Sequence, residues 1–153
     1  RNKQRGLTLL DLNCRSKAMI RFIRTLPSAA AILCWAIPAY PGEVEILHTI
    51  FKQNETTWRV DTTLRHADAG WKHYATAWRI VDAAGTVLGT RELAHPHTDE
   101  QPFTRSLAGV VIPISLDTIF IEARDNIHGW SAQRLRVNLR VPKGSGYEVH
   151  PDE

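Results

Sequence analysis

The sequence contains very little sulfur. Its 153 residues include two cysteines, Cys14 and Cys34, and one methionine, Met19, all near the N-terminus. The rest of the chain therefore offers no disulfide, no thiolate ligand and no cysteine nucleophile. A domain of about 110 residues can fold without such cross-links, which become necessary below about 40 residues. The lack of sulfur argues against a cysteine-based zinc site and against a dedicated Cu(I) site.

Long hydrophobic runs are also missing. The apolar stretch over residues 29–37 is too short for a membrane span, which needs about 20 residues. It follows Arg21 and Arg24 and precedes small residues, which is the pattern of a secretory signal peptide. We expect a signal peptide over residues 19–39, cleaved after Ala36 or Ala39, with residues 1–18 as a non-native upstream extension. The alternative is a buried core helix.

The charge of the chain divides at the same place. The whole sequence has a formal charge of +3, but seven of its 19 basic residues and one of its 16 acids fall in residues 1–39. The remainder, with 12 basic and 15 acidic residues, is net acidic. A basic surface for nucleic acid is therefore not expected. We expect a bacterial protein of the periplasm or the secreted fraction, with no stable membrane insertion after signal cleavage.

Residues 40–142 show the pattern of an all-β domain. Apolar and polar residues alternate in TWRVDTTLRH (57–66) and RLRVNLRV (134–141), as in strands with one buried and one wet face. With the similar runs over 44–52, 73–82, 86–93, 103–112 and 117–125, they predict seven short antiparallel strands. We expect a single immunoglobulin/fibronectin III-like sandwich, with a small barrel as the alternative. Residues 143–153 are expected to be a flexible tail.

Five of the seven histidines fall in or beside alternate connections between these strands. Antiparallel strands reverse direction at each turn, so the connections after 57–65, 86–93 and 117–125 lie at one end of the domain. The expected metal ligands there are His66, His73, His95, His97 and His128. Imidazole is the commonest metal ligand, and without sulfur the pattern favours Cu(II) or Zn(II). Asp68, Glu100, Arg105 and Asp125 would orient the imidazoles from a second shell.

Two other interpretations of this end stay open. The histidines can form a hydrogen-bonded structural corner without a metal. Alternatively, the loop aromatics Trp71, Tyr74, Phe103 and Trp130 can present a surface for a sugar or a peptide. No catalytic motif such as Gly-x-Ser-x-Gly or His-Glu-x-x-His occurs, so a binding role is favoured over an enzyme, and no catalytic residue is assigned. Partner proteins are unknown.

Three segments carry a resemblance. HADAGWKHYATAW (66–78), ARDNIHGW (123–130) and the stretch containing HPH and EQPFTRS (95–106) resemble an uncharacterised family of small secreted proteins from proteobacteria. The likeness covers about residues 57–130. It implies an exported single-domain protein, and it implies no particular ligand.

Overall fold

The computed structural model describes residues 42–152, which form two β-sheets and contain no helix. The expected signal peptide and the expected upstream extension lie outside the described residues. Within residues 42–152, no helix is long and apolar enough to cross a membrane.

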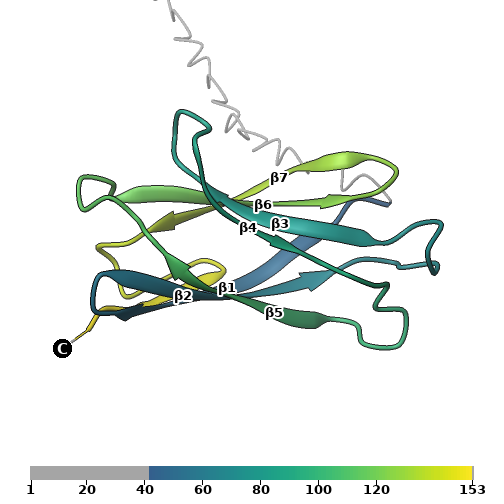
Figure 1. The fold of residues 1–153 in the computed structure, drawn as a ribbon, viewed down its shortest axis with the longest axis horizontal. Coiled ribbons are helices and arrows are strands. Elements are labelled where there is room, and N and C mark those ends of the chain that lie inside the picture. Colours follow the sequence, from purple (N-terminus) through teal and green to yellow (C-terminus); the bar gives the residue numbers. More distant parts are fainter. Residues whose placement is uncertain (1–41, 153) are drawn as a thin grey trace, which may run out of the picture. The chain divides into compact units, whose positions relative to one another are not determined.

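Nine strands make up the fold. They are β1 (Glu45–Asn54), β2 (Thr57–Arg65), β3 (Ala75–Val81), β4 (Val87–Glu92), β5 (Phe103–Val110), β6 (Thr118–Asp125), β7 (Gly129–Asn138), β8 (Lys143–Gly144) and β9 (Tyr147–His150). One sheet has the order β5-β2-β1-β9-β8 and the other the order β4-β3-β6-β7. Figure 1 shows the two sheets stacked as layers. The prediction of an all-β sandwich with seven principal strands is confirmed.

The alternating pattern of the strands produces the core between the sheets. In β2, Val60, Thr62 and Leu64 are completely buried, while Arg59 before them and Arg65 after them are exposed. The same alternation along β6 buries every second residue. The largest fully buried side chain is Trp78 of β3. Because side chains alternate between the two faces of a strand, each sheet has one apolar face, and these two faces pack against each other to form the core.

The C-terminal part of the sandwich differs from the prediction. The seventh strand begins at Gly129 and ends at Asn138, so it is shifted toward the N-terminus from the expected 134–141. Residues 143–150, expected to belong to a flexible tail, form β8 and β9 instead. Strand β9 pairs in parallel with β1 and buries Tyr147 and Val149 in the core. The burial of these two side chains holds the segment against the sandwich. The sequence did not reveal this strand because four residues are too few to show a clear alternation.

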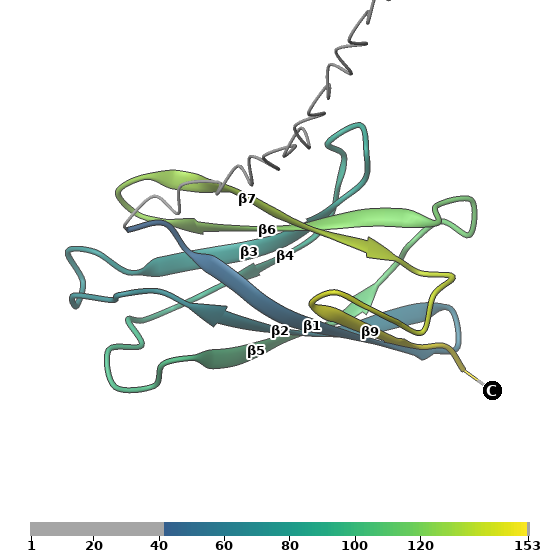
Figure 2. The same ribbon diagram turned by 180° about the vertical axis from the view of Figure 1, so that it is seen from behind.

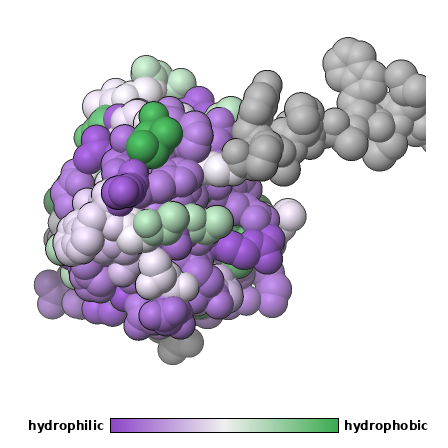
Figure 3. Space-filling view, turned by 90° about the vertical axis from the view of Figure 1, so that its right-hand side faces the viewer, coloured by the Kyte–Doolittle hydropathy of each residue, from purple (hydrophilic) through white to green (hydrophobic). Residues whose placement is uncertain are grey.

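The connections after β2, β4 and β6 lie at the same end of the sandwich. They appear on the right in Figure 1 and on the left in the reverse view of Figure 2. We call this end, formed by residues 66–74, 93–102 and 126–128, the histidine end. Figure 3 looks onto it and shows a mostly hydrophilic surface. The β1–β2, β3–β4 and β5–β6 connections lie at the other end.

Candidate metal centre

The structure brings three of the five expected histidine ligands into direct contact. The ring of His73 meets the ring of His66 edge-on, with the centroids 4.7 Å apart, and meets that of His128 with the centroids 5.1 Å apart. His66 directly follows β2, His73 precedes β3, and His128 lies in the tight β6–β7 turn. The cluster therefore brings together the end of β2 in one sheet with the start of β3 and the β6–β7 turn in the other.

A possible metal-binding group lies within this cluster. His66, His73 and Asp125 each offer one ligand atom, and these atoms lie within 4.8 Å of one another. His73 Nε2 lies 3.6 Å from Asp125 Oδ1, and it is buried without a hydrogen-bond partner. A nitrogen that is buried and aimed at a carboxylate is a ligand position that an ion can satisfy. The geometry therefore permits a metal ion here, without identifying which one.

Asp125, expected in the second shell, is placed among the candidate ligands. Its carboxylate is fully buried at the end of β6 and accepts hydrogen bonds from the backbone N–H groups of Ile127 and His128, at 2.7 and 2.6 Å. Burial acts to raise the pKa of Asp125, but these backbone donors and the His128 ring outweigh it, so the pKa lies below its ordinary value. Asp125 is therefore an ionised carboxylate with a fixed orientation.

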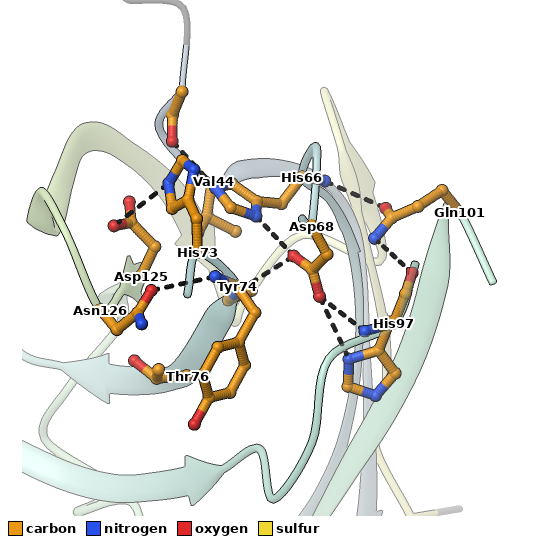
Figure 4. A network of polar contacts seen from close by, with 12 residues as sticks. Val44, His66, Asp68, His73, Tyr74, Thr76, His97, Gln101, Asp125 and Asn126 are labelled. Atoms are coloured by element: carbon orange, nitrogen blue, oxygen red, sulfur yellow. Dashed lines mark hydrogen bonds and ion pairs between the residues drawn. The ribbon is translucent and has the colours of Figure 1, made fainter. Parts of the chain in front are cut away.

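Asp68, which we expected to orient an imidazole, contacts two histidines. Its Oδ1 lies 2.5 Å from His66 Nδ1 and accepts the backbone N–H of Ala75, while its Oδ2 accepts the backbone N–H of His97 (Figure 4). A carboxylate only accepts hydrogen bonds at these contacts, so His66 Nδ1 must carry the proton. The other ring nitrogen, Nε2, faces the carbonyl oxygen of Gly42 and is the His66 atom that could bind a metal. Carboxylate–histidine pairs of this kind orient the ligands of many metal sites.

His95 and His97 form a separate pair beside this group. Their ring centroids lie 4.7 Å apart, but His95 is exposed whereas His97 is buried. The His97 ring stacks on Phe103 at 3.9 Å between centroids, and neither of its nitrogens has a hydrogen-bond partner. The segment bends at His95 and is not a strand, yet the two rings lie side by side. His97 Nδ1 approaches Asp68 Oδ2 only to 3.9 Å.

The other expected site residues lie around the histidines. Glu100 and Arg105 form an ion pair of 2.7 Å at the surface, with no hydrogen bond to an imidazole in the described residues. Their contact lowers the pKa of Glu100. Phe103 is a core residue under His97, and the Arg79 guanidinium covers the ring of Trp130 at 3.8 Å.

Trp71 and Tyr74 differ from the other loop aromatics. Trp71 is 67% exposed and meets Tyr74 edge-on, with the ring centroids 5.6 Å apart. The backbone carbonyl of Trp71 accepts a hydrogen bond from Asn126, which holds the loop in place. Of the four aromatic residues proposed to bind a ligand, only Trp71 is exposed, Tyr74 and Trp130 are partly buried, and Phe103 is buried.

Sequence reasoning missed two residues that shape the centre. Gln101 joins two loops, since its side chain accepts the backbone N–H of His66 and donates to the backbone carbonyl of His97. Gly42 precedes β1, and its carbonyl oxygen lies 2.9 Å from His66 Nε2. Neither residue type signals a metal site in sequence, and a backbone carbonyl leaves no sequence signal at all.

The comparisons with known proteins give one distant relative. A protein named "Putative lipoprotein" from the haloarchaeon Halomicrobium mukohataei is 37% identical over 76 residues, which cover 50% of this chain and 37% of that protein. This chain thus spans little more than a third of the relative's length. No family model matches the chain, and no solved structure matches it. The partial match supports neither the expected proteobacterial family nor its sequence pattern.

Proposed function

We propose that this protein is an exported β-sandwich that binds one divalent transition metal ion, Cu(II) or Zn(II), at the histidine end. The ligands are His66, His73 and Asp125. The observation that carries the proposal is the buried, unpartnered Nε2 of His73 beside the ionised carboxylate of Asp125. Two imidazoles and one carboxylate are donors that suit both ions.

Export rests on two independent arguments. The expected signal peptide over residues 19–39 is one, and the relative named a lipoprotein is the other. Together they favour the bacterial periplasm or the secreted fraction and a role in metal handling there. Because His and carboxylate ligands dominate the site, it can operate in an oxidising compartment where thiolate ligands would be lost to disulfides.

The chemistry of binding follows from the hydrogen bonds of the site. Asp68 holds the proton of His66 on Nδ1, so Nε2 presents its lone pair once its own proton has left. An ion at this place also supplies the missing partner of His73 Nε2. Since only deprotonated imidazole coordinates, binding competes with protons, and affinity falls as the solution is acidified.

The test is calorimetric titration of Zn(II) and Cu(II) into the full chain with Cys14→Ser and Cys34→Ser, so that no thiol competes. We expect the protein to bind at least one ion at micromolar concentration or better. Replacing His66 or His73 by alanine should weaken binding by more than about 100-fold, beyond the loss typical of an outer-shell residue. His150→Ala, in β9, is the control, because that ring is exposed on the outside of the sandwich. The proposal is wrong if the parent binds neither ion below millimolar concentration.

A second candidate function rests on the exposed ring of Trp71, which meets the partly buried ring of Tyr74. Exposed, rigidly held aromatic rings on loops bind sugars or short peptides. Tryptophan fluorescence of the parent and of Trp71→Ala, titrated with oligosaccharides and peptides, tests it. A saturable change lost in Trp71→Ala supports this function, and equal responses of the two proteins exclude it.

A further inference from the structure

We infer that the backbone carbonyl of Gly42 is a further ligand of the same ion, so that metal binding fastens the segment leading into β1 to the histidine end. This inference rests on the proposed function and adds a ligand to it. The observation behind it is the 2.9 Å contact between the Gly42 carbonyl oxygen and His66 Nε2.

This contact places the carbonyl oxygen beside a candidate ligand atom. Asp68 meets His66 at Nδ1, which turns Nε2 toward the carbonyl oxygen of Gly42. An ion bound by Nε2 on this side of the ring would also lie within reach of that oxygen. Ligand atoms bound at about 2 Å to one ion, at angles of 90° to 110°, lie about 2.8 to 3.3 Å apart.

The backbone at Gly42 is built for a close approach. Its φ angle of +115° lies in the region that side-chain-bearing residues rarely adopt. A Cβ atom at this position would come within 2.9 Å of Cε1 of His128. Glycine therefore lets the chain pass between two imidazoles with its carbonyl oxygen facing the candidate ligands.

The same segment is already tied to β7 on its other side. The backbone N–H of Val44 donates to Ser131 Oγ, and the side chain of Gln133 hydrogen-bonds both the N–H and the carbonyl of Ile46. An ion that also holds Gly42 would connect this segment to the β2–β3 loop and to the end of β6. A backbone carbonyl is the weakest donor of such a set, in the manner of the axial oxygen of some copper sites. It should thus tune affinity and order without deciding whether the ion binds.

Hydrogen–deuterium exchange of the full chain carrying Cys14→Ser and Cys34→Ser, with and without the ion that the titration identifies, tests the fastening. We expect the amides of residues 43–46 to exchange at least about tenfold more slowly in the loaded protein, together with those of the loop 66–74. The turn over 82–86, at the other end, should not change. Protection of 66–74 with unchanged exchange at 43–46 overturns the inference but leaves the proposed function intact. Failure of the parent to bind any ion overturns both.

A matched pair of glycine variants measures the carbonyl ligand itself. Gly42→Ala forces φ out of its present value and should weaken metal binding about tenfold, equivalent to about 1.4 kcal/mol. Gly85→Ala also places an alanine at a positive φ, here +87°, but nothing lies near its Cβ in the β3–β4 turn. It should bind the ion as tightly as the parent. If both variants keep the parent affinity and remain folded by circular dichroism, the Gly42 carbonyl is not a ligand.

Discussion

At the scale of single residues, His97 is the least expected feature of this protein. Sequence reasoning assigned it to the metal, yet its ring is buried against Phe103, with no partner for either nitrogen. Burial lowers the pKa of His97 below its ordinary value of 6.5, and the charges of Arg105 and His95 lower it further, against the opposing effect of Asp68 and Glu100. The folded protein therefore protonates this ring at a lower pH than the unfolded chain does.

This lowered pKa predicts a loss of stability in acid. Below pH 6.5 the unfolded chain binds a proton at residue 97 and the folded chain does not, so the free energy of unfolding falls with pH until the lowered folded pKa is reached. The effect of one such proton is at most about 1.4 kcal/mol per pH unit. Urea unfolding at pH 7.5 and 5.5, in the presence of a chelator, should show a smaller pH dependence in His97→Gln than in the parent.

Two features keep this measurement specific. Asp125 also has a lowered pKa, but its contribution is lost only below its ordinary value of 3.8, outside the measured range. His150→Gln, with a largely exposed ring, is the control and should keep the pH dependence of the parent. Equal pH dependence in the parent and in His97→Gln would show that residue 97 does not titrate differently on folding.

At the scale of elements, the short strand β9 decides how the first sheet ends. It extends the sheet beyond β1 by parallel pairing, and Val149 is 2% exposed between the layers. A buried valine of this kind stabilises the folded protein through apolar burial and close packing. The C-terminal residues are thus part of the core and not an appendage.

Truncating Val149 should therefore cost stability. Val149→Ala removes two buried methyl groups, and we expect a loss of about 1 to 3 kcal/mol, between the values typical of smaller and larger core truncations. Val141→Ala is the matched control, because that valine is 39% exposed in the turn before β8 and should change stability by less than about 0.5 kcal/mol. Denaturant unfolding of both variants gives the comparison. Equal effects at the two positions would mean that β9 is not packed in solution.

The sequence predicted the strands better than the site. Alternation along β2 and β6 identifies their buried faces without any knowledge of the neighbours, and strand parity correctly places the β2–β3, β4–β5 and β6–β7 connections at one end. It could not tell that Asp125 points inward while His95 points outward, because both are loop or strand-end residues whose orientation depends on packing across the sheets. Nor could it find the Gly42 carbonyl, which has no side-chain signal.

At the scale of the whole molecule, the core and the candidate centre are separate. The strands hold the apolar interior, whereas the ligand atoms come from the last residue of β6 and from residues flanking β2 and β3. Because the ion would bind the folded chain and not the unfolded one, binding should stabilise the entire sandwich by mass action.

Thermal unfolding measures this coupling. At a free ion concentration 100 times the dissociation constant, the gain of about 2.7 kcal/mol should raise the midpoint temperature by about 10 °C in a domain of this size. His73→Ala should show no rise, while its midpoint without metal should stay close to that of the parent, since the ring is a quarter exposed and outside the core. A similar rise in both proteins would place the stabilising ion elsewhere.

The path of the chain through the histidine end has a consequence for folding order. The β2–β3 connection passes from one sheet to the other, and Asp125 joins the cluster only after β6 has paired with β3. Neither sheet alone, and no single hairpin, contains the three candidate ligand atoms. An incompletely folded chain therefore lacks the assembled candidate centre. Metal binding at this place should occur only after the two sheets have packed together.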